Sequence, residues 1–286
     1  MKETAFPEQR QDRMPAIESE MTPRPEYRHP DWRPSGLLQD RTAVITGGDS
    51  GIGRAVAALF AAEGADIVIG YLDEHGDAED TKRAVEAQAR RCLTIAGDLS
   101  HEGQARELVK QATDFAGGSI DIFIQNASVQ YDHEEFAAAP IDELRRVVDV
   151  NLLGGLFALH AAIPSMTEHG SIIVTTSVTA YRGSDHLAAY AATKGALASL
   201  VRSLGEQLAK DGLRVNGVAP GPVWTPLIVG SFAPEDVATF GTKAPMGRAA
   251  QPWEIAPSFL FLASERWSGY FTGQVLHPNG GEAVNA

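Results

Sequence analysis

The chain of 286 residues contains a single cysteine, Cys92, and eight scattered histidines. One thiol cannot form a disulfide within the chain, and no Cys/His grouping has the spacing of zinc ligands, so we expect no metal site. Positive charge is also scarce, because 24 Lys and Arg residues stand against 37 Asp and Glu residues. The resulting net charge of −13 argues against nucleic acid or an anionic membrane as the main partner.

Long apolar runs are missing as well. No run approaches membrane-spanning length, and the polar N-terminus is unlike a secretion signal. We therefore expect a cytoplasmic protein without a membrane partner. Hydrophobic residues make up 44% and charged residues 21% of the chain, as in ordinary globular proteins. The length is sufficient for one large α/β domain with a sizeable core.

The first 40 residues differ in composition from the rest, because they hold six of the sixteen prolines and show little apolar periodicity. We expect residues 1–36 to form an extended or disordered arm, since such a segment buries too little surface to offset its ordering entropy. The alternative is an arm that packs across a neighbouring subunit, anchored by Met21, Tyr27 and Trp32. The domain is predicted to span residues 37–286.

A glycine-rich turn follows the first apolar run of the domain. The β-branched run at 43–46 leads into Gly47-Gly48-Asp49-Ser50-Gly51-Ile52-Gly53 and then into an apolar helix. A strand, a glycine turn and a helix N-terminus together direct backbone N–H groups at a phosphate. The sequence therefore predicts a nucleotide site here.

Strands and helices alternate through the rest of the chain. The expected strands lie at 43–46, 65–70, 92–96, 120–124, 171–176, 213–218 and 273–277. This alternation predicts one doubly wound α/β domain with a parallel sheet of seven strands and helices on both faces. Ligands of such sheets bind beyond the carboxyl ends of the strands, and five residues fall at these ends: Gly47, Asp98, Asn126, Ser177 and Pro220.

The segment 187–208 is rich in Ala and Leu and predicts a helix that carries Tyr190 and Lys194. Residues four apart share a helix face, so the phenol and the ammonium point the same way. A free tyrosine titrates near pH ~10, and a neighbouring cation favours the phenolate and lowers that pKa. The pair can therefore pass a proton to or from a substrate oxygen.

From Leu37 to Ala286 the sequence resembles the short-chain dehydrogenase/reductase family. The resemblance is carried by the 46–53 string, by Asp98-Leu99, by Asp149-Val150-Asn151-Leu152 and by the set Ser177, Tyr190 and Lys194. Pro220-Gly221 and Asn279-Gly280-Gly281 also match segments of that family. The 46–52 string and the Pro-rich N-terminal extension resemble a bacterial subgroup of general stress and uncharacterised oxidoreductases.

The resemblance implies a Rossmann-type fold and an NAD(P)-dependent transfer of hydride between the nicotinamide and an alcohol/carbonyl pair. It implies Tyr190 as general acid–base, Lys194 as the group that holds the ribose and lowers the Tyr190 pKa, and Ser177 as a hydrogen-bond partner of the carbonyl oxygen. Asn151 is expected to anchor a water that relays protons. The implied cofactor contacts are Gly47, Asp49, Ser50, Gly51, Ile52, Gly53, Tyr71, Asp98, Leu99, Asn126, Ala127, Tyr190, Lys194, Pro220, Gly221 and Val223.

The choice between NAD and NADP depends on the end of the second strand, where an acid favours NAD and an arginine favours NADP. That end reads Gly70-Tyr71-Leu72, with acids only just beyond it at Asp73 and Glu74. Asp49 would oppose a 2′-phosphate, whereas Arg54 lies close in sequence. We expect NAD rather than NADP.

The substrate is expected to be a small alcohol, aldehyde or ketone. The family often has glycine where this chain has Ser128, which predicts an altered pocket. Ser128, Val178 and Trp224 are the predicted substrate residues, with Gln130 and Tyr181 as further candidates, each equally open to a packing role. Residues 223–248 interrupt the strand–helix pattern and predict a substrate lid.

Three other classes of protein are alternatives to this function. A nucleotide-binding redox sensor without turnover tends to lack part of the Ser/Tyr/Lys set, which is complete here. An epimerase or dehydratase of sugar nucleotides usually has a larger C-terminal substrate domain, and a purely structural module has no use for an acid–base pair. The apolar faces of the helices at 141–162 and 187–208 resemble those that pair in the family's tetramers, so we expect a homotetramer.

Overall fold

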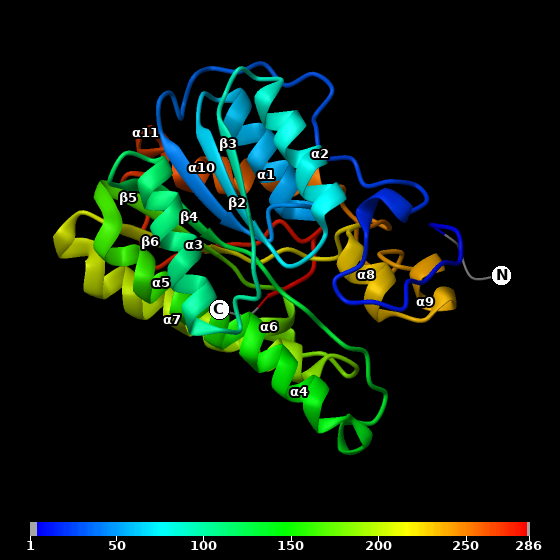
Figure 1. Cartoon of the computed structure of the whole chain (residues 1–286). Helices are drawn as coiled ribbons and strands as arrows, with labels where there is room; N and C mark the ends of the chain where they lie inside the picture. The colour runs from blue at the N-terminus through cyan, green and yellow to red at the C-terminus, as the bar shows by residue number, and fades with distance from the viewer. Residues whose placement is uncertain (1–4, 285–286) are drawn as a thin grey trace.

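The computed structural model describes residues 5–284, and within them seven parallel strands form one sheet in the order β3-β2-β1-β4-β5-β6-β7 (Figure 1). Residues 1–4 of the predicted arm and residues 285–286 of the predicted domain lie outside the described part. The strands are β1 (Thr42–Thr46), β2 (Asp66–Tyr71), β3 (Cys92–Ala96), β4 (Ile120–Gln125), β5 (Met166–Thr175), β6 (Arg214–Val218) and β7 (Val275–Leu276). The predicted Rossmann-type doubly wound sheet is confirmed.

Helices connect the strands. The helices of the first half are α1 (Gly51–Ala62), α2 (His75–Glu86), α3 (Glu102–Phe115), α4 (Ile141–Val148) and α5 (Gly155–Ala162), with 3₁₀ turns η1 (Glu18–Glu20), η2 (Phe136–Ala138) and η4 (Ile163–Ser165) and a π-helical turn η3 (Asp149–Gly154). The second half contains α6 (Thr179–Arg182), α7 (Ala188–Leu208), the 3₁₀ turn η5 (Ala209–Asp211), α8 (Pro226–Ser231), α9 (Pro234–Ala238), α10 (Pro252–Ala263) and α11 (Glu265–Ser268).

Both faces of the sheet are covered, which explains why the central strands are continuous apolar runs. On one face Ile45 and Ile69 pack with Phe60 of α1 and Phe259 of α10. On the other face the neighbouring side chains, such as Val44, pack with residues of α3, α5 and α7. The order of the strands reverses between β1 and β4, and at such a switch point ligands bind beyond the carboxyl ends of the strands.

The helix predicted at 141–162 is present but is not uniform. It runs as α4, then the π-helical turn η3, then α5, and η4 follows directly. By length and composition alone, the run Ile141–Ser165 could cross a membrane, which contrasts with the expectation from the sequence. Here α5 packs on α3 and β4, and its buried residues belong to the core of the domain. Core helices of soluble proteins satisfy the same criterion, so the length and composition of this run are weak evidence for a membrane span.

Residues 5–36, which we call the arm, lie along this chain's own domain (blue in Figure 1). Phe6 stacks on Trp224 with 3.7 Å between the ring centroids, and the Trp224 indole N–H donates to Pro23 O at 2.8 Å. Met21 is buried in the same cluster. Trp32 donates to Glu63 at the end of α1 at 2.9 Å.

Tyr27 and Trp32 pack against the core cluster that contains α1 and α10. The side chains predicted as anchors to a neighbouring subunit therefore contact their own domain. The physical reason is that the domain itself offers apolar surface beside α1, α8 and α10, which the sequence of the arm does not reveal.

Candidate active site

The turn between β1 and α1 has the backbone geometry of a phosphate-binding loop. Gly47 and Gly51 have φ angles of +63° and +51°, which favour glycine. Gly53 lies so close to the carbonyl of Gly47 that a Cβ atom would collide with it. The helix N-terminus therefore comes close to the strand end, with its dipole and free N–H groups directed at the cleft. One of these groups, Gly51 N–H, already donates to the carboxylate of Glu18 at 2.6 Å.

The ends of β2 and β3 form the next part of the cleft. Asp98 accepts hydrogen bonds from Arg146 at 2.7 Å and from the Ser100 hydroxyl at 2.7 Å. Burial opposes ionisation of Asp98, but these hydrogen bonds outweigh it and lower the pKa of the carboxyl. The Tyr71 hydroxyl lies 3.0 Å from His75 Nδ1. Both residues are thus held in fixed orientations by neighbours from other elements.

Asn126 holds three strand ends together. Its side chain donates to Gly47 O at 3.0 Å and accepts from the Thr175 hydroxyl at 3.1 Å. Thr46 Oγ1 accepts from the backbone N–H groups of Asn126 at 2.9 Å and of Ala127 at 3.1 Å. Asn126 lines the cleft, and these contacts also fix the shape of the glycine turn.

Asn151 lies in the π-helical turn η3 and is fully buried. Its side chain accepts from Val129 N at 2.8 Å and donates to Val129 O at 2.8 Å, with a further bond to Thr193 Oγ1 at 3.3 Å. Asn151 itself does not line the cavity. Its side chain instead fixes the loop after β4, which carries Ser128, and the predicted anchoring of a water stays a prediction.

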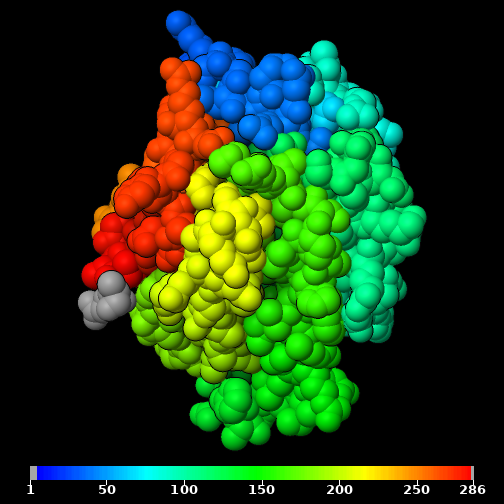
Figure 2. Space-filling view, turned by 90° about the vertical axis from the view of Figure 1, so that its left-hand side faces the viewer, coloured from blue at the N-terminus to red at the C-terminus, as the bar shows by residue number. Residues whose placement is uncertain are grey.

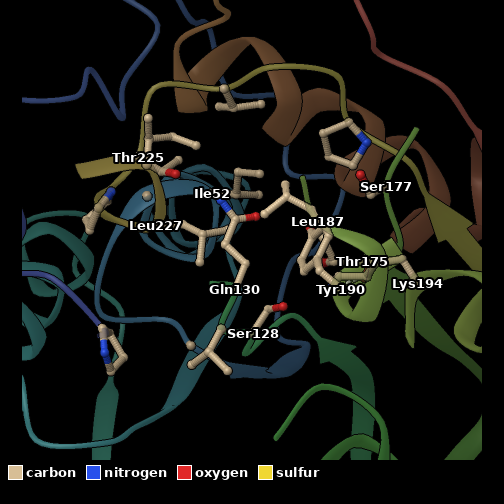
Figure 3. Close-up of a pocket in the computed structure, with 18 of the residues that line it drawn as sticks. Ile52, Ser128, Gln130, Thr175, Ser177, Leu187, Tyr190, Lys194, Thr225 and Leu227 are labelled. Atoms are coloured by element: carbon tan, nitrogen blue, oxygen red, sulfur yellow. Dashed lines mark hydrogen bonds between the residues drawn. The ribbon is translucent and has the colours of Figure 1, made fainter. Parts of the chain in front are cut away.

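Ser177, Tyr190 and Lys194 meet at the carboxyl ends of β5 and β6 (Figure 3). Lys194 is 1% exposed, and its Nζ donates to Thr175 O at 2.9 Å. The same ammonium lies 5.3 Å from the centroid of the Tyr190 ring. The Ser177 hydroxyl accepts from the backbone N–H of Thr179 at 3.2 Å. Helix α7 thus brings the phenol and the ammonium to one face, as their spacing predicted.

The electrostatics of this cluster differ from the expectation. Burial raises the pKa of Tyr190 to about 12, although the hydrogen bond with Ser177 lowers it in part. Burial also lowers the pKa of Lys194 to about 7. The expected lowering of the Tyr190 pKa by Lys194 is therefore wrong for the protein by itself. The reason is that desolvation disfavours the charged form of both groups, and no effect of one group on the other offsets it.

These residues surround one cavity of about 510 Å³, a volume that suits a small-molecule or cofactor site. Figure 3 shows Tyr190 and Lys194 on one side, Thr225 and Leu227 on the opposite side, and Ser128 between them. Every predicted cofactor residue lines this cavity except Gly53, which packs against Gly47 instead. Of the predicted substrate residues, Ser128 and Val178 line it.

Trp224 was predicted to contact substrate, and this prediction is wrong. Its side chain is 0% exposed, is covered by Phe6 and does not line the cavity. Among the further candidates, Gln130 lines the cavity, whereas Tyr181 packs edge-on against His277 with 4.7 Å between the ring centroids. Two aromatic residues of the predicted lid, Phe232 and Phe240, do line it.

A family model described as Enoyl-(Acyl carrier protein) reductase matches residues 47–282. "Uncharacterized oxidoreductase YhxC" and "General stress protein 39" of Bacillus subtilis (strain 168) are each 46% identical to this chain. The match with YhxC covers 99% of this chain and 98% of that protein. The match with General stress protein 39 covers 98% of this chain and 97% of that protein. The chain belongs to the short-chain dehydrogenase/reductase family.

Other members of the family extend the comparison. "NADPH-dependent aldehyde reductase 1, chloroplastic" of Arabidopsis thaliana is 44% identical over 99% of this chain and 100% of that protein. A short-chain dehydrogenase of Burkholderia cenocepacia J2315, solved in complex with NADP, is 28% identical with a TM-score of 0.80 and covers 86% of this chain and 98% of its own. A 3-ketoacyl-(acyl-carrier-protein) reductase of Brucella melitensis complexed with NADH is 30% identical, with a TM-score of 0.79. The match covers 86% of this chain and 100% of that protein.

This short-chain dehydrogenase/reductase is thus an NAD(P)-dependent oxidoreductase. Its residues fit the cofactor, because the positive φ angles of the glycine turn, the helix N-terminus and the cavity lie in one continuous site. The expectation of NAD over NADP is not supported, since the compared proteins include both an NADP and an NADH complex. Asp49, on which that expectation depended, is only 5% exposed, and burial raises its pKa to about 6.

Three residues of the cleft, Met14, Pro15 and Arg146, have no signal in the sequence. Met14 and Pro15 come from the arm, where no periodic pattern marks them. Arg146 lies on α4 and reaches Asp98 across the sheet edge, and Glu74 lies just beyond β2. The sequence indicates Glu74 by its place just beyond the second strand, but no local signal connects Met14, Pro15 or Arg146 with the site.

Proposed function

We propose that this oxidoreductase interconverts an alcohol and a carbonyl compound, with Tyr190 as general acid–base. The observation that carries this proposal is the meeting of Tyr190 and Ser177 at the cavity, with Lys194 behind them. A nicotinamide cofactor supplies or accepts the hydride. In the direction of reduction Tyr190 gives its proton to the carbonyl oxygen, and a neutral phenol, favoured by the high pKa, is the form that this step needs.

The neighbours of Tyr190 have separate roles. Ser177 donates a hydrogen bond to the developing oxyanion. Lys194, held by Thr175 O, replaces the proton on Tyr190 and binds the ribose. Because burial brings the pKa of Lys194 to about 7, this group can both accept and release a proton near neutral pH. Asn151 positions the loop with Ser128 through its two bonds to Val129.

The substrate site lies beside Tyr190, under the segment 223–248, which serves as a lid. Ser128 supports this assignment, because its hydroxyl is buried and has no hydrogen-bond partner among residues 5–284. A buried hydroxyl without a partner is costly, and a polar substrate atom would satisfy it. Small aldehydes and ketones that carry a further polar group fit this arrangement. The name of the A. thaliana relative, an aldehyde reductase, supports an aldehyde as substrate.

Both NAD(H) and NADP(H) are proposed as cofactors. Asp49 opposes a 2′-phosphate less than a fully charged carboxylate would, because its pKa is raised to about 6 and its side chain is buried. The name of the A. thaliana relative supports use of NADPH.

The proposed assembly is a cytoplasmic homotetramer. Exposed apolar side chains support it, because Ile141, Val148 and Leu153 project from the run of α4 and η3 with exposures of 61%, 38% and 36%. Figure 2 shows the side of the molecule on which the green surface of α4 and α5 adjoins the yellow-green surface of α7. Two copies of such a face bury apolar area when they pair.

The test measures oxidation of NADH and NADPH with a panel of aldehydes, ketones and diones, for the wild type and Tyr190→Phe. We expect turnover in the wild type and a loss of about 10²- to 10⁴-fold in kcat in Tyr190→Phe, with the Kd of the cofactor unchanged. Retained turnover in Tyr190→Phe would refute the acid–base role. Tight nucleotide binding without turnover on the whole panel would favour the redox-sensor alternative instead.

A further inference from the structure

The arm crosses the mouth of the cofactor cleft and is fastened on both sides of it. On the lid side, Gln11 N donates to Val229 O at 2.9 Å. On the nucleotide side, Glu18 N donates to Asp77 Oδ2 at 2.7 Å. Between these points Met14 and Pro15 line the cavity. The arm is therefore a wall of the site rather than a separate appendage.

At the end of β2 the arm contributes one cation, Arg13. Its Nη2 lies 2.8 Å from Glu74 Oε1 and also pairs with Asp73. The Glu74 side chain is 1% exposed and lines the cavity, whereas the Arg13 side chain is 39% exposed and lies beside the cavity-lining residues Met14 and Glu74 without lining the cavity itself. An acid and an arginine thus meet at the place where a Rossmann site selects between a ribose hydroxyl and a 2′-phosphate.

Three other basic groups on the nucleotide side of the cleft are already engaged. Arg54, which the sequence offered as an alternative, is 4% exposed and bonds to Glu18, to the carbonyls of Asp49 and Asp77 and to Thr81. Its guanidinium is therefore buried and already bonded to oxygens of the protein.

Two further basic groups also have hydrogen-bond partners already. Arg146 bonds to Asp98 and Ser100 at the end of β3, and His75 lies against the Tyr71 hydroxyl. Arg13, by contrast, bonds to protein oxygens through Nε and Nη2, and its Nη1 has no partner within residues 5–284. A guanidinium has five N–H donors in a planar fork that suits phosphate oxygens.

We propose that Arg13 binds the 2′-phosphate of NADP(H), so that the arm completes the nucleotide site and Glu74 offers the alternative contact to the free ribose hydroxyl of NAD(H). The inference rests on the proposed use of both cofactors. The pair Arg13–Glu74 accommodates either cofactor, because the arginine matches the phosphate and the acid matches the hydroxyl.

The comparisons agree with a role that is special to proteins with this arm. The family model begins at residue 47, and the two solved structures cover 86% of this chain but 98% and 100% of their own. The full-length relatives from B. subtilis and A. thaliana match 98% to 99% of this chain. Residue 13 therefore lies outside the part of the chain that the family model matches.

The test compares Arg13→Gln with Arg10→Gln, an arm residue whose ion-pair contact is with Asp12. Calorimetry measures the Kd of NADPH, NADH, 2′,5′-ADP and 5′-AMP for the full chain without substrate. We expect Arg13→Gln to weaken NADPH and 2′,5′-ADP by about 10- to 100-fold, as for a lost charge-assisted hydrogen bond, and to change NADH and 5′-AMP less than about twofold. Arg10→Gln should change none of them.

Two further variants test whether the charge at position 13 suffices and whether Glu74 contacts the free ribose hydroxyl. Arg13→Lys retains a point charge and should restore part of the preference for the 2′-phosphate, and Glu74→Gln should weaken NADH without weakening NADPH. An equal effect of Arg13→Gln on all four nucleotides, or on none, would overturn the proposal. A wild type that binds none of the four would instead refute the proposed function itself.

Discussion

Helix α7 and the arm both bury polar groups, but the groups that come together are close in sequence in α7 and distant in sequence in the arm. In α7 the two chemical groups, Tyr190 and Lys194, come from one helix, and their separation of four residues alone brings them to one face. The only helical turn of the arm described here is the three-residue η1, and its polar groups find partners far away in the chain, such as Glu18 with Arg54. Local periodicity therefore reveals the first region but not the second.

The contrast also concerns what the burial achieves. In α7, burial shifts the pKa values of Tyr190 and Lys194 in opposite directions, as the proposed proton transfer requires. In the arm, burial pairs charges that hold the phosphate-loop helix, because Glu18 bonds both Gly51 N–H and Arg54. Burial in α7 therefore serves the proposed proton transfer, whereas burial in the arm positions the phosphate-loop helix.

The largest expected effect tests the arm. Glu18→Ala leaves the buried Arg54 without its carboxylate on that side, although Asp77 Oδ1 remains 3.4 Å from the guanidinium. Removal of one partner of a buried ion pair is strongly destabilising, so we expect the free energy of unfolding to fall by about 3 kcal/mol. Urea denaturation measures it, with Glu20→Ala, an exposed acid of the same turn, as the control. Equal losses in the two variants would show that the arm contributes no specific ion pair.

The next effect, which is measured per pH unit, tests helix α7 through pH. Burial lowers the pKa of Lys194 from 10.5 to about 7, so between these values the folded state binds fewer protons than the unfolded state. The free energy of unfolding should therefore rise with pH across this window, by up to about 1.4 kcal/mol per pH unit from this group.

Lys194→Met should lack this contribution, so its stability relative to the wild type is greatest near pH 7 and declines toward pH 10. Subtraction of the two curves removes the opposite contributions of Glu18 and Glu74, whose pKa values are raised to about 7 and about 8 by burial. Lys210→Met, at an exposed position, is the control. A constant difference across pH would mean that Lys194 is not desolvated in the folded protein.

The smallest effect tests how the arm is held on the segment 223–248. Phe6→Ala removes the stacked contact with Trp224, which should cost about 1 kcal/mol. The consequence should be local, so hydrogen exchange at the Gln11 amide, which bonds to Val229 O, is expected to speed up. Phe136→Ala, at a side chain that is 60% exposed, is the matched control. Unchanged exchange at Gln11 would show that the arm is held without this stack.

Most of the fold and the centre of the site could be predicted, because their signals are local. The β-branched runs, the glycine turn at 47–53 and the spacing of Tyr190 and Lys194 each follow from short stretches of chain. The place of Trp224 could not be predicted in this way. An aromatic residue beside a pocket and one buried under another segment have the same sequence pattern, and only the contact with Phe6 separates them.

The sequence by itself determined the parallel sheet, the position of the nucleotide loop and the identity of the groups that meet at the carboxyl ends of the strands, because strand and helix periods act over a few residues. The tertiary structure alone decided which way the arm lies, which partners Arg13 and Arg54 take, and how far burial shifts the pKa values of Tyr190 and Lys194. These properties depend on desolvation and on partners that are distant in the chain, and neither is written in a local pattern.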